Sequence, residues 1–268
     1  MKHMVKGVKP WHVVADIWLA NVVGVALLFV EYLYVLPLPE EAQVASVTRD
    51  NVVLGIASTL IAWTVLAAYG APRAHRALGW TVRGTDPTPE EQQLTLDLPW
   101  SLFKMGVVLW SISTAAFLAL DLPISVPFGL LAGGAVFSGG LATVATAFLL
   151  STRLLRPSTA RVLELHPPEP GTTAGVGERA IFIWGLTTGV PLLGLVMMVA
   201  FSPFSGASLE RLSISGIVVG SVVLLGGLFA TLLFAKSIGD PLCELTTALA
   251  EIEKGDLHVR VPVDDNGE

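Results

Sequence analysis

Acidic side chains are the residues of this sequence that come closest to forming a chemical site. Glu31 and Asp121 each lie near the end of a long apolar segment, and further carboxylates lie in the neighbouring polar stretches, namely Glu40, Glu41, Asp50 and Glu210. Carboxylate oxygens are ligands that hard divalent cations prefer. A metal site around Glu31 and Asp121 is therefore one interpretation. Solvated loop charges are the favoured one, because no recognisable ligand spacing joins these residues.

The sequence contains no motif for enzymatic chemistry. It has no phosphate-binding GxxxxGK[ST] loop, no dinucleotide-binding GxGxxG and no plausible Ser/His/Asp arrangement. The histidines are scattered and form no metal-binding pattern: His3, His12, His75, His166 and His258. We expect no catalytic residue and no cofactor within these 268 residues. The function must therefore come from how whole elements are arranged.

The composition is typical of a chain embedded in a lipid bilayer. Of its 268 residues 53% are hydrophobic and 14% are charged, and the mean hydropathy is +0.68. The net charge of −6 gives no support for nucleic-acid binding. A single cysteine, Cys243, excludes an internal disulfide framework. We therefore predict an all-α, polytopic membrane protein.

Six apolar segments are long enough to cross a hydrocarbon core, which needs about 20 residues. The first lacks a signal-peptidase exit, so we interpret it as an uncleaved span. We predict spans at about 13–35, 52–71, 102–120, 124–150, 180–201 and 214–234. Pro123 and Pro127 are expected in the turn before the fourth span. The inner connections, roughly 72–100 and 151–179, are longer and more polar than the outer ones. After the second, fourth and sixth spans a proline is expected at the helix exit (Pro72, Pro157 and Pro241), followed in each case by a short segment with helical potential.

Basic residues lie almost entirely on one side of these spans. Fourteen of the sixteen lysines and arginines fall on the face that includes both termini, and only Arg49 and Arg211 fall opposite. Because cationic loops are retained in the cytoplasm, both termini are predicted to be cytoplasmic, with the protein multi-pass in the plasma membrane. The outer connections are short, so no sizeable outer sensor domain is expected.

A heptad-like segment follows the sixth span. Ile238, Leu242, Leu245, Leu249 and Ile252 are separated by 4, 3, 4 and 3 residues, the spacing that lines one stripe of a helix in a bundle. Gly255 is expected to end that helix. An alternating stretch that includes Leu257 follows, and then the acidic run VDDNGE, typical of a helix start.

This succession resembles a HAMP domain, the parallel four-helix linker of membrane receptors. The resemblance covers Ile238 to Glu268, with Pro241, Gly255, Asp256 and Glu268 at characteristic positions. The second HAMP helix is absent from these residues, and a free-standing heptad stalk is the alternative. We expect residues 1–236 to form the transmembrane domain and residues 237–268 the first half of the HAMP domain. The expected relay residues are Ile238, Pro241, Leu242, Leu245, Leu249, Ile252, Gly255, Asp256, Leu257 and Glu268.

A HAMP bundle needs two chains, so the resemblance implies a parallel homodimer. The physical argument agrees, because a lone amphipathic helix of about 15 residues is marginally stable and must bury its apolar stripe. In the sixth span Gly216 and Gly220 have the small-xxx-small spacing that permits close helix approach. The same spacing joins Gly129 to Gly133 and Gly185 to Gly189. Packing within one protomer is the favoured interpretation of any single pair.

Six spans followed directly by HAMP resemble the membrane adenylate cyclases of class III from actinobacteria. Residues 154–165 (LLRPSTARVLEL) and 175–195 (GVGERAIFIWGLTTGVPLLGL) also look like that group. The resemblance implies a catalytic domain beyond residue 268 that converts ATP into cyclic AMP and diphosphate with Mg²⁺ or Mn²⁺. None of that domain's catalytic residues lies in this sequence.

Two other classes remain open. The chain could be the input module of another HAMP receptor, such as a histidine kinase or a chemoreceptor. A small transporter or channel is less consistent, because it has no need of a heptad helix leaving its final span. In a receptor without an outer domain, a stimulus must act on the helices. We therefore expect membrane lipid as a partner, a lipid or fatty acid as a possible ligand, and a relay in which rotation or tilt of the sixth span repacks the heptad seam.

Overall fold

The computed structural model describes residues 8–36, 38, 40–165, 181–182, 184–201, 203 and 209–253. Every element in these ranges is helical, as the sequence predicts. In chain order they are α1 (Pro10–Val30), the π-helical turn η1 (Glu31–Val35), the 3-10 turn η2 (Glu40–Gln43), α2 (Ala45–Arg83), α3 (Pro89–Asp121), α4 (Val126–Leu165), the π-helical turn η3 (Gly185–Gly189), α6 (Val190–Phe201) and α7 (Leu209–Glu253).

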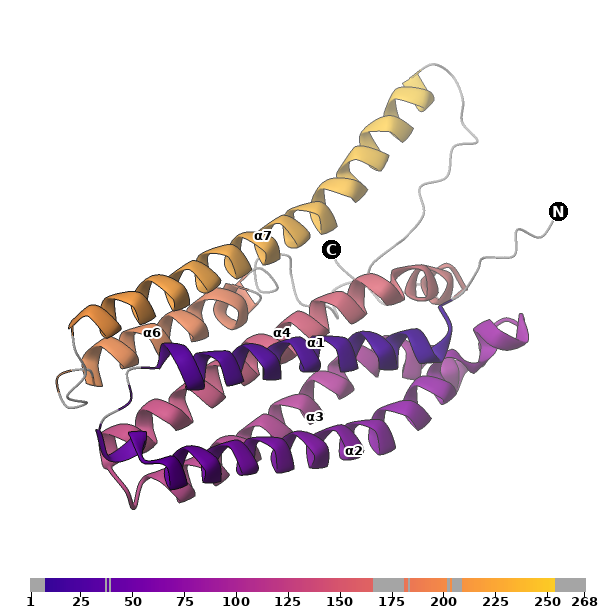
Figure 1. Ribbon diagram of the computed structural model, residues 1–268. Helices are drawn as coiled ribbons and strands as arrows, with labels where there is room; N and C mark the ends of the chain where they lie inside the picture. The colour runs from indigo at the N-terminus through magenta and orange to yellow at the C-terminus, as the bar shows by residue number, and fades with distance from the viewer. Residues whose placement is uncertain are drawn as a thin grey trace.

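The helices run back and forth as antiparallel neighbours (Figure 1). Helices α1 to α4 form a bundle in which α4 packs against both α1 and α3 and also carries α6 on its other side. Helix α7 lies beside α6 and extends beyond the bundle at its C-terminal end. The last helix is therefore the element least enclosed by its own protomer.

Five helices are long and apolar enough to cross a membrane: the α1–η1 helix, α2, α3, α4 and residues 212–229 of α7. These correspond to five of the six predicted spans. The fifth predicted span, 180–201, corresponds to η3 and α6, whose apolar part Val190–Ala200 is shorter, and some of its residues lie outside the described ranges. Five potential spans are thus established and the sixth stays a prediction.

The helical potential predicted beyond Pro72 and Pro157 is confirmed, but the expected helix exits at these prolines are wrong. Helix α2 continues through Pro72, α3 begins at Pro89 and contains Pro99, and α4 continues through Pro157. Only residues 84–88 separate α2 from α3. Pro127 is also inside a helix, in the first turn of α4, where a missing N–H costs little. Pro72 and Pro157 lie where the predicted apolar spans end, but the helices continue beyond them.

A buried apolar cluster compensates for the interior prolines. Ala74, Ala77 and Leu78 of α2 pack with Leu98 of α3 and Leu155 of α4, and all five are at most 2% exposed. An interior proline costs a helix about 3 kcal/mol, whereas fully burying one large aliphatic side chain contributes about 1.5–3 kcal/mol. Several such side chains hold the extensions together beyond the predicted spans, so the helices continue.

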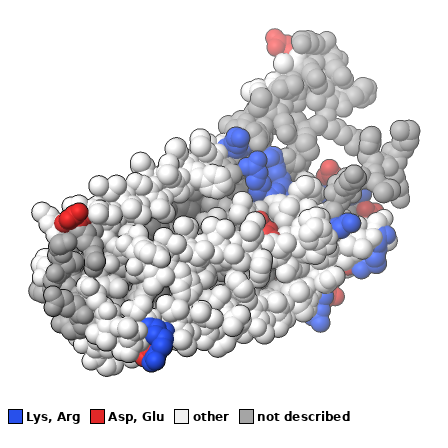
Figure 2. Space-filling view, viewed as in Figure 1, with Lys and Arg blue, Asp and Glu red and all other residues white. Residues whose placement is uncertain are grey.

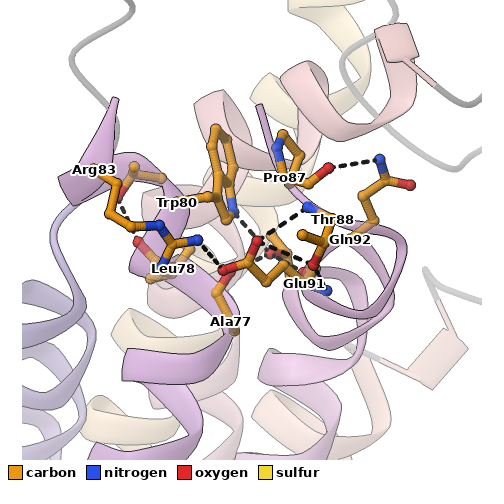
Figure 3. Close-up of polar contacts among 10 residues, drawn as sticks. Ala77, Leu78, Trp80, Arg83, Pro87, Thr88, Glu91 and Gln92 are labelled. Carbon is orange, nitrogen blue, oxygen red and sulfur yellow. Dashed lines mark hydrogen bonds and ion pairs between the residues drawn. The ribbon is translucent and has the colours of Figure 1, made fainter. Parts of the chain in front are cut away.

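The link between α2 and α3 is set by helix-end chemistry (Figure 3). Gly84 ends α2 in the left-handed region at φ 66°, a conformation that glycine adopts without steric cost. Thr88 caps α3: its hydroxyl accepts from the Glu91 amide, and the Glu91 carboxylate accepts from the Thr88 amide at 3.0 Å. Arg83 forms an ion pair with Glu91 across the link. The link is therefore a defined turn.

A buried threonine ties the two helices together just inside this turn. The Thr95 hydroxyl is fully buried and donates toward the carbonyl oxygens of Ala77 and Glu91, each at 2.7 Å, while Trp80 Nε1 donates to it at 3.4 Å. One hydroxyl hydrogen serves the two carbonyls, so these bonds share a single donor. This polar contact fixes the register of α2 against α3.

Charged side chains are gathered at the two ends of the molecule (Figure 2). The end where α2 and α4 terminate and α3 begins, called here the basic end, carries most of the visible lysine and arginine, and a white surface separates it from the opposite end. The opposite end, called the acidic end, holds Arg49 in an exposed ion pair with Asp50 at 2.9 Å. This distribution matches the predicted positive side of the chain.

We predict that Thr88→Ala loosens the start of α3. Loss of an N-cap threonine costs about 0.5–2 kcal/mol, because amides of the first turn lose their acceptor. Hydrogen–deuterium exchange should therefore speed up in a peptide covering residues 88–94. Thr85→Ala is the matched control, since the Thr85 side chain is exposed and it is the backbone amide of Thr85 that donates to the Trp80 carbonyl. Equal exchange in both variants would contradict the capping role.

Candidate functional site

Helix α7 is the element that unites the predicted functional residues. It runs without a break from Leu209 to Glu253, through Gly239, Asp240 and Pro241. The three residues between the sixth span and the heptad segment are thus helical as well. With 45 residues the helix is about 68 Å long, more than twice the roughly 30 Å hydrocarbon thickness. One continuous helix therefore joins the acidic end to the heptad segment.

The predicted relay residues are only partly described. Ile238, Pro241, Leu242, Leu245, Leu249 and Ile252 all lie on α7, so the seam is helical as predicted. Leu249 is 63% exposed. The side chains of the other five lie outside what the structure describes, as do Gly255, Asp256, Leu257 and Glu268 entirely. Leu249 occupies a heptad position well beyond the apolar window of α7, and the part of the protomer that the structure describes does not cover it.

Helix α7 packs on its own protomer at two levels. Near the acidic end the Ser215 hydroxyl, which is fully buried, donates to the carbonyl oxygen of Val35 at the end of η1. Further along, α7 packs against α6 and η3, and a Cβ atom at Gly227 would lie 2.7 Å from Thr188 Oγ1. Large apolar side chains of α7 such as Leu224 and Leu228 are nevertheless more than half exposed. One side of the helix is thus held by the protomer, and another side is exposed.

A groove separates α7 from α1 and α4. It has a volume of about 510 Å³ and is lined by apolar side chains, among them Leu131 of α4 and Val222 and Phe229 of α7. Asp16 and Glu31 lie along its α1 wall. A volume of this order is within the range of small-molecule sites. An acyl chain of a bilayer lipid is apolar and therefore matches the lining of this groove.

The glycine pairs differ in what surrounds them. A Cβ atom at Gly129 would lie 2.7 Å from the backbone nitrogen of Leu122, and one at Gly133 would lie 2.5 Å from Leu118, so this pair permits packing within the protomer. At Gly216 a Cβ atom would meet nothing within 4 Å, and at Gly220 only Leu195 at 3.9 Å. The favoured intramolecular interpretation is confirmed for Gly129 and Gly133, whereas the Gly216 surface is open.

The structure places the two predicted metal candidates in different surroundings. Glu31 lines the groove beside α7, whereas Asp121 is fully buried and accepts from Asn51 Nδ2 at 2.8 Å. Within the described part of the chain no three Asp, Glu, His or Cys side chains gather as a metal site would require. The sequence reasoning missed Asn51. The signal was an amide at the border of an otherwise apolar segment, directly after Asp50.

Tyr32 joins Asn51 and Asp121 to form a cluster at the acidic end. The Tyr32 side chain lines the same cavity as Asn51, which donates to the Asp121 carboxyl. The cavity lies among α1, α2, α3 and α4 and has a volume of about 90 Å³. Phe29 and Phe117 supply part of its apolar wall. This polar cluster and the relay helix are the two candidate functional features.

These features define the class: an all-helical protein with five helices able to cross a membrane and a long terminal helix.

The chain is 31% identical over 199 residues to "Uncharacterized protein Rv1318c" of Mycobacterium tuberculosis (strain ATCC 25618 / H37Rv), a match that covers 72% of the chain and 36% of that relative. It is 24% identical over 256 residues to "Uncharacterized protein Rv1319c" of the same organism, covering 93% of the chain and 47% of the relative.

The chain thus spans about a third to a half of the length of the curated relatives it matches. "Uncharacterized protein Rv1320c", also from Mycobacterium tuberculosis, is 24% identical over 198 residues, covering 72% of the chain and 34% of the relative. No protein-family model and no solved structure matches the chain. The relatives establish similarity to mycobacterial proteins and assign no activity.

We predict that Asn51→Leu destabilises the acidic end. The substitution removes the donor to a fully buried carboxyl, and a hydrogen bond to a charged group contributes about 1.5–3 kcal/mol. The melting temperature in detergent should fall by several degrees. Asp50→Asn is the control, because Asp50 is exposed and paired with its neighbour Arg49. Equal melting temperatures for Asn51→Leu and the wild type would show that the bond contributes nothing.

Proposed function

We propose that this chain is the membrane anchor, dimerisation and signal-relay module of a class III adenylate cyclase. The observation that carries the proposal is the unbroken helix α7, which runs from a potential membrane span through Pro241 into the heptad segment. A continuous helix transmits rotation, tilt or displacement of one end to the other. The basic end faces the cytoplasm in this proposal, in accordance with the positive-inside rule.

The heptad segment belongs to the first helix of a HAMP bundle in this proposal. Its support is the spacing from Ile238 to Ile252, the Gly-Asp-Leu connector at 255–257 and the exposed Leu249. Two such helices bury their stripes against each other and against the second HAMP helices of a parallel homodimer. The open surface at Gly216 is where α7 helices can approach within the membrane.

The cyclase assignment depends on the resemblance of the whole arrangement to the class III membrane enzymes. In that arrangement a domain following the relay forms cyclic AMP from ATP with Mg²⁺ or Mn²⁺, and these 268 residues supply no catalytic group. The match to longer mycobacterial proteins is consistent with such an extension in the relatives. The test is cyclic AMP formation by membranes from cells that express the complete parent gene.

A second candidate is the input module of another HAMP receptor. The same observation supports it, because a histidine kinase or chemoreceptor can use the same relay. Membranes that form no cyclic AMP but incorporate acid-labile phosphate from ATP would favour the kinase. Membranes that form cyclic AMP would exclude it. A lipid ligand, in either case, would act in the groove between α1, α4 and α7, where it touches the relay helix directly.

We predict that Leu249→Asp uncouples the output from the membrane domain. A carboxylate on the seam disfavours burial of the stripe between helices, because burying an unpaired charge is strongly unfavourable. In the intact parent protein, output activity should change at least about threefold, as expected for loss of an interaction of about 1 kcal/mol. Ala250→Asp is the control, since it introduces the same charge at an exposed, neighbouring position off the seam. Equal outputs in both variants would remove the relay argument.

We predict that Gly216→Leu weakens dimerisation without unfolding the protomer. The added side chain meets open space within the protomer but blocks close approach of a second α7. Cross-linking yield in membranes should fall several-fold while the melting temperature of the protomer is unchanged. Gly133→Leu is the contrasting variant, because its side chain would collide with Leu118 and lower the melting temperature. An undiminished dimer yield for Gly216→Leu would place the interface elsewhere.

A further inference from the structure

The polar cluster at the acidic end contains three buried atoms that lack a hydrogen-bond partner among the described residues. They are the Tyr32 hydroxyl, Asn51 Oδ1 and Asp121 Oδ2. Asn51 is 2% exposed and Asp121 is fully buried. Leaving a buried polar atom unsatisfied costs about 1–3 kcal/mol, and native proteins avoid it. Three such atoms in one cluster indicate a ligand group that bonds to them.

The chemistry of these atoms selects the ligand group. Asn51 Oδ1 and Asp121 Oδ2 accept hydrogen bonds, and the Tyr32 hydroxyl can accept one. The amide nitrogen of Asn51 is already engaged, with Asp121 Oδ1 at 2.8 Å and the Val47 carbonyl at 3.2 Å. Two of the three atoms can only accept, so the complementary group supplies at least two donors, and a positive charge suits the Asp121 carboxyl. A primary ammonium has all of these properties.

The cavity beside the cluster selects what the ammonium is attached to. Tyr32 and Asn51 line it together with apolar side chains such as Val25, Phe29, Leu109 and Phe117. Its volume of about 90 Å³ corresponds to roughly six to nine water positions at 10–15 Å³ each. That space suits a short alkyl chain. A bare metal cation would leave this apolar space unused.

We propose that the cluster of Tyr32, Asn51 and Asp121 binds a primary ammonium group whose alkyl portion occupies the adjoining cavity. The source is a free alkylamine or the ethanolamine headgroup of a phospholipid, which present the same –NH₃⁺ chemistry. A fatty acid is excluded from this site, because its carboxylate adds acceptors and a like charge beside Asp121. The larger groove beside α7 is a different site: Leu28, Leu36 and Ala135 line both, but Tyr32 and Asn51 line only the cavity.

The position of Tyr32 connects this site to α7. Tyr32 lies in the π-helical turn η1, and Val35 at the end of that turn accepts the hydrogen bond of Ser215 from α7. Single π-helical turns occur often at functional sites. A ligand that holds Tyr32 thereby acts on the turn to which α7 is attached. This transmission rests on the proposed relay function, whereas binding does not.

The binding test uses the 268-residue chain in nanodiscs and three probes with the same six-carbon chain: hexylamine, hexanol and hexanoate. Hexylamine should raise the melting temperature saturably by about 2–4 °C, as expected for about 1 kcal/mol of ligand stabilisation in a chain of this size. Hexanoate should give no shift. Nanodiscs of phosphatidylethanolamine and of phosphatidylcholine distinguish the sources, since choline has no N–H donor. A hexylamine shift abolished in phosphatidylethanolamine assigns the headgroup as the ligand.

Variants link the shift to the cluster. Tyr32→Phe removes only the hydroxyl and should weaken hexylamine binding at least about threefold, equivalent to one hydrogen bond. Asp121→Asn should abolish the preference of the site for the amine over hexanol. If Asp121→Asn does not fold, the result for Tyr32→Phe decides whether the cluster binds the amine. Asp50→Asn, an exposed carboxylate near the same end, should bind as the wild type does. The proposal is overturned if hexylamine, hexanoate and ammonium chloride raise the melting temperature equally. It is also overturned if hexylamine gives no shift of the melting temperature in nanodiscs of either lipid.

A separate readout tests the transmission. Cys243 is the only cysteine of the chain and lies on α7, so a spin label can be attached there without mutation. Saturating hexylamine should change the distance distribution between labels in a dimer, and Ser215→Ala should remove that change while hexylamine still binds. Binding without any change at Cys243 would contradict the relay and leave the site intact. If hexylamine does not bind, the proposed ammonium site is wrong. The relay function is then still tested by Leu249→Asp.

Discussion

The continuity of backbone hydrogen bonding in α7 is the constraint on which the rest of the structure depends. A membrane-spanning segment must satisfy its amides internally, so it is helical for reasons unrelated to signalling. What is specific here is that the helix does not end where the apolar residues end. It continues through Pro241, which removes one donor, and reaches Glu253. Motion of the span is therefore motion of the heptad seam.

The packing of the protomer complements this continuity. Helices α1 to α4 share a buried cluster at the basic end and the Asn51–Asp121 contact at the acidic end, so that bundle is fixed at both ends. Helix α7 is held near Ser215 and borders a groove of about 510 Å³ along its α1 and α4 side. A helix that packs mainly on α6 and on the turns η1 and η3, with this groove on its α1 and α4 side, can tilt without disrupting the core of the α1–α4 bundle.

Sequence patterns predicted the parts of this fold that hydrophobicity alone controls. The runs of apolar residues gave the helices and their order, and the 4-3 spacing gave a helix through Leu249. They indicated helical segments beyond Pro72 and Pro157 but not that these continue the spans without a break, because proline predicts a local cost whereas the outcome depended on a buried cluster that joins residues far apart in the chain, such as Leu78 and Leu155. Asn51 was missed for the same reason, since its partner lies 70 residues away.

The three prolines that follow even-numbered spans lead to a last inference about assembly. Beyond Pro72 the helical extension of α2 buries Leu78, and beyond Pro157 the extension of α4 buries Val162 and Leu163, each at most 1% exposed. Beyond Pro241, the extension of α7 is of the same kind, yet Leu249 is 63% exposed. If each extension persists because it buries apolar surface, the third must bury its stripe against something other than the described part of the protomer. A second copy of the chain, which carries the same stripe at the same height, meets that requirement by symmetry.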